Sequence, residues 1–215
     1  MNKNKLKLTF LLTATIIPIT LATWLFGVYM ESGVSSTTNK GVLVSPVLEL
    51  TSLGLTDSKG NDAYQSFEAL TQGVSPDDYN PRPWQLLFLG TENCDDVCAE
   101  RLYFLRQIHT RLAGEASRVE RVYVMVSTSA NPDTLAAMEQ ELSVQQPGLR
   151  VLQALEKPLH DVLERTLEHT ADPAKQHYIY VADPLGNIML YFTPENTPEE
   201  ILSDLDKLLD HSSLG

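Results

Sequence analysis

The sequence is poor in basic residues. Lys and Arg together number 16 against 28 Asp and Glu, which gives this 215-residue chain a net charge of −12. No run of Lys or Arg follows residue 7. A surface that binds phosphates needs a basic patch, so this charge balance excludes nucleic acid as an expected partner. No internal repeat is visible, and only two cysteines are present, Cys94 and Cys98.

Charge is also missing from residues 8–30, a stretch of 23 residues near the N-terminus. Such a stretch is long enough to span a bilayer with some tilt. Lys3, Lys5 and Lys7 precede it and Glu31 follows it, a bias that places the N-terminus in the cytoplasm and the rest outside. A cleaved signal peptide is the alternative, but its apolar region would be shorter and would end in a small-residue cleavage site. We expect a single-pass protein of a bacterial inner membrane, with its C-terminal domain in the periplasm.

Three segments are expected along the chain. Residues 1–30 are the cytoplasmic tip and transmembrane anchor. Residues 31–41 are small and polar and are predicted to form a tether. Residues 42–215 are predicted to form one domain, since 43% hydrophobic and 20% charged residues are typical of globular proteins.

Within the domain, strand and helix patterns alternate from Trp84 onward. Residues 84–89 form an apolar run, ended by Gly90, of the kind found in central strands buried on both faces. Thr197, Pro198 and Glu200 form a capping box that begins the last helix. Further strands are predicted at 42–50, 121–126, 149–155, 178–182 and 187–192, with helices after 94, 131 and 156 and a loop-rich region over 51–83. This order predicts an α/β, thioredoxin-like fold, in which helices flank a central mixed sheet.

The two cysteines follow the first central strand and open the helix after it. Helix N-termini favour thiolates, because their free N–H groups and partial positive charge face whatever lies there. One helical turn brings residues four apart to the same side. Cys94 and Cys98 are therefore candidate redox thiols that close a disulfide, or candidate ligands of one soft metal ion.

Two plainer interpretations of the cysteines stay open. One is a structural disulfide in an oxidising compartment, although a bridge that encloses three residues constrains the unfolded chain little. The other is a pair of buried free thiols. Four nearby carboxylates, Glu92, Asp95, Asp96 and Glu100, favour a bound cation over a reactive thiolate. The two aspartates also fit the first turn of a helix, where they complement its dipole.

His177 is the candidate third metal ligand. It precedes the strand predicted at 178–182, whose start lies beside the cysteine loop in a thioredoxin-like fold. Two thiolates and an imidazole suit copper. The alternative is a partly exposed histidine at a strand end. We expect residues 175 and 177 to share a face of that strand.

Residues 84–210 resemble the Sco/SenC proteins, thioredoxin-like copper chaperones of cytochrome c oxidase assembly. The apolar strand followed by Cys94-Asp95-Asp96-Val97-Cys98 is similar to that family's strand and C-P-D-V-C motif, and residues 179–186 are similar to its hairpin. The tethered N-terminal segment is also similar to the family. Residues 39–43, together with the helix at residues 101–103, resemble a divergent bacterial Sco-related membrane protein. The resemblance implies copper as the cofactor and a cytochrome c oxidase subunit or other oxidase assembly factors as partners.

Three positions depart from the family pattern. Asp95 replaces the family's proline, Ser129 its aspartate and Lys175 its metal-binding histidine. Cys94 and Cys98 therefore carry over directly, whereas His177 carries over only if the strand pairing or the preceding loop is shifted. The leading hypothesis is a membrane-anchored assembly factor that delivers copper or exchanges thiols, a carrier more than a turnover enzyme. The alternatives are a thiol–disulfide reductase of a partner's copper-site cysteines and a non-catalytic docking module.

Overall fold

The computed structural model describes residues 3–31, 39–72, 82–167 and 171–212. The chain divides into two compact units, Met1–Asn39 and Lys40–Gly215. The first contains helix α1 (Lys3–Glu31). No helix within the described residues is both long and apolar enough to cross a bilayer. Residues 32–38, most of the predicted tether, lie outside the described residues.

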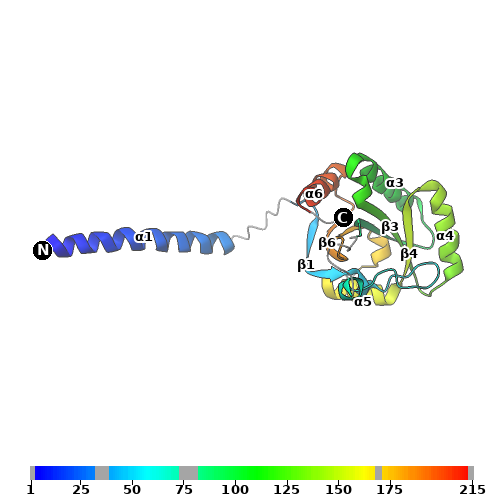
Figure 1. Ribbon diagram of the computed structural model, residues 1–215, viewed down its shortest axis with the longest axis horizontal. Helices are drawn as coiled ribbons and strands as arrows, with labels where there is room; N and C mark the ends of the chain where they lie inside the picture. The colour runs from blue at the N-terminus through cyan, green and yellow to red at the C-terminus, as the bar shows by residue number, and fades with distance from the viewer. Residues whose placement is uncertain (1–2, 32–38, 73–81, 168–170, 213–215) are drawn as a thin grey trace. The chain divides into compact units, whose positions relative to one another are not determined.

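The second unit is built on one six-stranded mixed sheet with the order β1-β6-β5-β2-β3-β4 (Figure 1). The strands are β1 (Val42–Glu49), β2 (Trp84–Thr91), β3 (Val119–Ser127), β4 (Leu149–Leu155), β5 (Ile179–Ala182) and β6 (Asn187–Phe192). The helices are α2 (Phe67–Thr71), α3 (Asp96–Arg111), α4 (Pro132–Gln145), α5 (Glu156–Leu167) and α6 (Pro198–His211). β2, β3 and β4 run parallel, whereas β5 and β6 form an antiparallel hairpin against β2. This arrangement confirms the α/β fold expected from the sequence.

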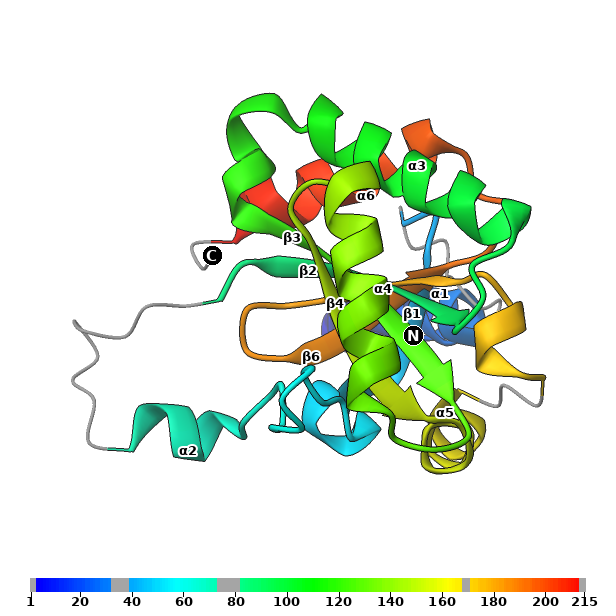
Figure 2. The same ribbon diagram turned by 90° about the vertical axis from the view of Figure 1, so that its right-hand side faces the viewer.

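The side chains of β2 alternate between two cores. Leu86 and Phe88 face the core formed with α3, α4 and α6, whereas Leu87 and Leu89 face the core formed with α5. Figure 2 shows α3 and α6 on one side of the sheet and α5 on the other. All four side chains are at most 2% exposed, as expected for a central strand whose apolar run is covered on both faces.

Local signals in the sequence set the limits of several elements. Asn131 accepts a hydrogen bond from the N–H of Thr134 and so caps α4. The capping box of α6 forms as predicted between Thr197 and Glu200. β1 lies at the sheet edge, as its internal Pro46 predicts, and its pairing with β6 is interrupted between Leu43 and Leu48.

The described residues of the region 51–83 are mostly irregular, as expected, apart from α2 and part of a 3₁₀ helix, Leu50–Leu53. Two expectations about element limits are wrong. β2 does not end before Gly90 but continues to Thr91. Residues 175 and 177 do not share a strand face, since Lys175 ends a 3₁₀ helix (Pro173–Lys175) and β5 begins only at Ile179.

Candidate redox and metal site

The two cysteines lie where the chain passes from β2 into α3. Cys94 is in the connecting loop and Cys98 is in the first turn of α3, which begins at Asp96. Their sulfurs form a disulfide, with a Cα–Cα distance of 5.2 Å. The sequence therefore predicted correctly that the helical turn brings the two sulfurs together.

The two sulfurs differ in their surroundings. Cys98 is 4% exposed and belongs to the core formed by α3 and the sheet, whereas Cys94 is partly exposed. Cys94 also lines a cavity of about 340 Å³ between α3 and α4, with Met138 and Leu142 on its wall. An incoming group therefore reaches the sulfur of Cys94 more readily than that of Cys98.

Asp95 shows how this sequence differs from the C-P-D-V-C motif. It is the N-cap of α3, and its Oδ1 accepts a hydrogen bond of 2.9 Å from the backbone N–H of Cys98. A proline could not supply this acceptor. The helix-capping interpretation of Asp95 thus accounts for one of the four carboxylates without a bound cation.

Replacing Asp95 with alanine is expected to lower the free energy of unfolding of the oxidised protein by about 1 kcal/mol. Asparagine is an equally good N-cap, so Asp95→Asn is expected to retain most of that stability. Urea unfolding of the two variants measures the difference. Equal losses for both would show that charge and not capping is the contribution of Asp95.

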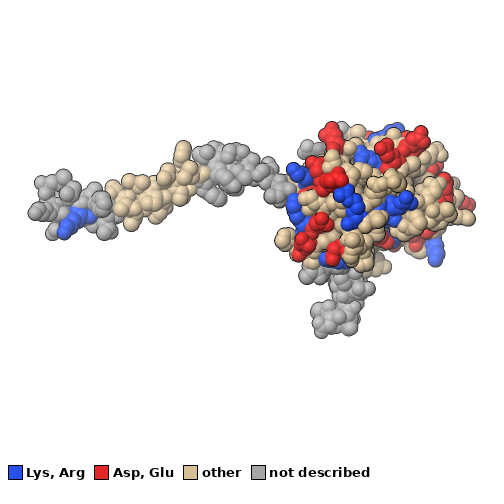
Figure 3. Space-filling view, turned by 90° about the horizontal axis from the view of Figure 1, so that it is seen from above, with Lys and Arg blue, Asp and Glu red and all other residues tan. Residues whose placement is uncertain are grey.

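The other three carboxylates, Glu92, Asp96 and Glu100, are exposed to solvent around the disulfide. The partly buried guanidinium of Arg101 lies 5.4 Å from the ring centre of Phe104, and burial lowers its pKa. Acidic and basic residues are both present on the face of the domain seen in Figure 3.

Tyr123 is a residue of this site that the sequence analysis missed. Its phenol donates a hydrogen bond of 2.7 Å to the carbonyl of Thr91, and its oxygen lies 3.7 Å from the sulfur of Cys98. Burial raises the pKa of Tyr123 far above its usual value, and the Asp95 carboxylate raises it further. The hydroxyl accordingly stays protonated. In the sequence, Tyr123 is one of several apolar residues in a buried strand, so no local signal distinguishes it from the core.

His177 is not gathered with the cysteines into a metal-binding group. Across residues 3–31, 39–72, 82–167 and 171–212, no cluster of three or more His, Cys, Asp or Glu side chains is placed to hold a metal ion. The imidazole of His177 stacks on Phe88 with 6.2 Å between ring centres, and its backbone has a left-handed φ of 53°. Such a φ is uncommon outside glycine. Lys175, at the family's histidine position, pairs with Asp172 at 3.0 Å.

The chain is similar to proteins of known family and structure. A family model described as a transmembrane-like, thioredoxin-like, C-terminal domain matches residues 84–212. No curated protein sequence matches the chain.

Solved structures of several Sco proteins are among those that share the fold. BsSco, a member of the Sco family of cytochrome c oxidase assembly proteins, has a TM-score of 0.54 at 14% identity over 81% of this chain and 98% of its own. Arabidopsis thaliana ScoI with copper bound has a TM-score of 0.52 at 14% identity over 80% and 100%. Yeast Sco1 with copper bound has a TM-score of 0.52 at 16% identity over 75% and 94%. At these identities the likeness concerns the fold, and at that level the expected resemblance to the Sco/SenC proteins is confirmed.

Proposed function

The chain belongs to the family of transmembrane-like, thioredoxin-like C-terminal domains, and from that premise we propose that it is a membrane-anchored accessory factor in cytochrome c oxidase assembly. Its Cys94–Cys98 pair exchanges thiols and disulfides with a partner or carries copper to it. The partner is an oxidase subunit or another assembly factor. The shared fold of BsSco, which is an oxidase assembly protein, supports this role.

The observation that carries the proposal is the unequal burial of the two disulfide sulfurs. A partner thiolate has access to Cys94, and the buried Cys98 is then the sulfur that leaves and later returns. A disulfide that only stabilised the fold would not need one sulfur beside a cavity. The short enclosed loop also fits easy reduction, because closing a short loop stabilises the folded chain less than closing a long one.

Copper transfer is the second candidate, with copper as the cargo. Reduced Cys94 and Cys98 provide two soft sulfur donors, which suit Cu(I). The described residues supply no third donor of the expected kind beside them. His177 remains a proposed ligand, which requires movement of the segment between Asp172 and β5.

Copper titration of the reduced full-length protein separates the two candidates. If the chain is a carrier with His177 as a ligand, His177→Ala weakens Cu(I) binding and changes its spectrum, whereas Lys175→Ala leaves both unchanged. Identical affinities and spectra for wild type and His177→Ala would remove His177 from the site. If the reduced wild type binds no Cu(I) but exchanges disulfides with partner thiols, copper transfer is ruled out and thiol–disulfide exchange is the remaining function.

Membrane anchoring by residues 1–30 is part of the proposal, and it predicts a topology. The lysines before the uncharged stretch and Glu31 after it place residues 31–215 outside the cytoplasm. Alkaline phosphatase fused after Gly215 is therefore expected to be active in a bacterial host. An inactive phosphatase fusion, together with an active cytoplasmic reporter at the same position, would reverse the topology.

A further inference from the structure

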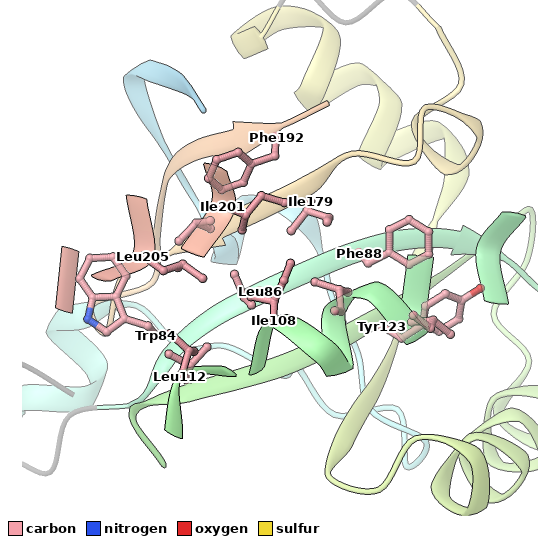
Figure 4. Packing of buried hydrophobic residues seen from close by; sticks show 14 of the residues in the cluster. Trp84, Leu86, Phe88, Ile108, Leu112, Tyr123, Ile179, Phe192, Ile201 and Leu205 are labelled. Atoms are coloured by element: carbon pink, nitrogen blue, oxygen red, sulfur yellow. The ribbon is translucent and has the colours of Figure 1, made fainter. Parts of the chain in front are cut away.

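Tyr123 is a core side chain whose polar atom lies close to the disulfide. The residue is fully buried in β3 on the side of the sheet that α3 covers. Figure 4 shows it at the end of the labelled cluster opposite Trp84, near Phe88. The distance of 3.7 Å between its oxygen and the sulfur of Cys98 is within hydrogen-bonding range for sulfur.

Gly90 provides the space that the phenol occupies. A Cβ atom at Gly90 would lie 2.5 Å from the Tyr123 oxygen and 2.7 Å from its Cε2. Gly90 is on the same face of β2 as Phe88, so any side chain there would point into the Tyr123 ring. The glycine in this strand is thus explained by close approach, and it directs the hydroxyl toward Thr91 and Cys98.

The Tyr123 hydroxyl can stabilise the reduced sulfur of Cys98 more than it stabilises the disulfide. A disulfide sulfur carries no hydrogen, and the single proton of Tyr123 already goes to the Thr91 carbonyl. After reduction, the Cys98 thiol can donate to the Tyr123 oxygen while that bond to Thr91 persists. A Cys98 thiolate would instead accept a hydrogen bond from the phenol, which the phenol would then donate to the sulfur in place of the Thr91 carbonyl. In both forms the reduced sulfur gains a hydrogen bond that the disulfide lacks.

We propose that Tyr123, held in place by Gly90, is a positioning residue that stabilises the reduced sulfur of Cys98 and shifts the disulfide–dithiol equilibrium toward the dithiol. This inference rests on the proposed redox function of the pair. It adds to that function a determinant of the equilibrium that lies outside the CxxxC segment.

The exchange step balances with a partner dithiol as the reductant. One partner thiolate attacks Cys94, the Cys94–Cys98 bond breaks, and its electron pair passes to the Cys98 sulfur beside Tyr123. The second partner thiolate then attacks the partner sulfur of the mixed disulfide and releases Cys94. The partner becomes a disulfide, and two electrons and two protons have moved to this chain.

The test is the equilibrium of the full-length protein with reduced and oxidised dithiothreitol. Tyr123→Phe keeps the ring and removes the hydroxyl, and we expect it to shift the equilibrium toward the disulfide by about three- to tenfold. While Cys98 is a neutral thiol, the hydrogen bond from Tyr123 to Thr91 is present in both redox states, so its loss cancels in this ratio. Tyr103→Phe, an exposed position on α3, is the matched control and should leave the equilibrium unchanged. Gly90→Ala, which displaces the hydroxyl without removing it, should shift it in the same direction as Tyr123→Phe.

A measurement on the wild-type protein tests the role of Tyr123 even if the variants fold poorly. With carbon-13 at the tyrosine Cζ, at least one tyrosine signal should move when the disulfide is reduced. No movement, or an unchanged equilibrium in a folded Tyr123→Phe, would overturn the role of Tyr123 and leave the redox function standing. A wild-type disulfide that dithiothreitol cannot reduce and reoxidise would instead overturn the proposed function itself.

Discussion

Replacing Cys94 and Cys98 together with serine is expected to abolish thiol–disulfide exchange, reducing its rate to that of buffer alone, and to abolish oxidase assembly activity in a host that depends on this protein. The reason is that both candidate chemistries, exchange and copper transfer, use these two sulfurs. Exchange with a fluorescent dithiol peptide and oxidase activity of complemented membranes measure the two effects.

Loss of the fold would not explain such a result. The bridge closes a loop of three intervening residues, and its removal is expected to lower the free energy of unfolding by about 2 kcal/mol on the chain-entropy account. Val97→Ala, an exposed change inside the same loop, is the matched control and should keep full activity. Retained oxidase assembly in the double serine variant would favour the docking-module alternative.

The single variants should differ from each other. Cys98→Ser leaves the accessible Cys94, which is expected to trap a partner as a mixed disulfide that cannot be resolved. Cys94→Ser leaves the buried Cys98, which is expected to trap little. In this test the partner is the oxidised, disulfide form of the peptide, which the remaining thiolate attacks with release of one peptide thiol. Non-reducing electrophoresis after acid quenching distinguishes the two variants, and equal trapping would contradict the assigned order of attack.

Replacing Asp204 with alanine is expected to lower the free energy of unfolding by roughly 2–4 kcal/mol, the largest stability change we predict. Asp204 is 1% exposed, and its Oδ2 accepts hydrogen bonds from the backbone N–H groups of Lys40 (2.5 Å) and Gly41 (2.9 Å). Its Oδ1 lies 3.2 Å from the ammonium of Lys207. Alanine would leave the buried N–H of Gly41 and the partly buried N–H of Lys40 without their acceptor.

Asp206, an exposed aspartate on the same helix, is the matched control for this prediction. Urea unfolding of the oxidised full-length protein should give a small change for Asp206→Ala and an intermediate loss for Asp204→Asn, which keeps one oxygen acceptor. If Asp204→Ala lost no more stability than Asp206→Ala, the assigned link between α6 and the start of the domain would be wrong.

The elements best predicted from the sequence are those with strong local signals. The nearly continuous apolar run of β2 predicts a strand covered on both faces, because Gln85 is the single polar residue in residues 84–89 and no alternation marks a solvent side. Pro46 identifies an edge strand, since proline cannot donate to a neighbouring strand. The pair Thr197 and Glu200 defines the start of α6 through side-chain hydrogen bonds within four residues. Each of these signals acts over a short stretch of chain.

The features that the sequence did not predict depend on contacts between distant segments. Gly90 and Tyr123 are 33 positions apart, and only the parallel pairing of β2 with β3 brings them together. A glycine after an apolar run is normally a strand end, so the pattern favoured the wrong limit. The strand expected to begin at residue 178, next to His177, begins only at Ile179. The short 3₁₀ helix before β5 has no clear periodic pattern from which this could have been predicted.

Asp204 is an intermediate case. Its spacing from Ile201 places it on the buried face of α6, so its burial could have been inferred from the helical period. Its hydrogen-bond partners could not have been inferred from the sequence, because Lys40 and Gly41 lie more than 160 positions away along the chain. The sequence thus indicates a buried carboxylate, and the fold supplies the reason for it.

The central claim is that Cys94 and Cys98 form a reversible redox pair, and the most direct test is intact-mass measurement of the full-length protein after alkylation at defined ratios of reduced to oxidised dithiothreitol. We predict no alkylation of the oxidised protein, two labels after reduction, and a return to none on reoxidation, with the transition following a two-electron curve. Two thiols that are alkylated under air, or a disulfide that the folded protein does not release to dithiothreitol, would contradict the account.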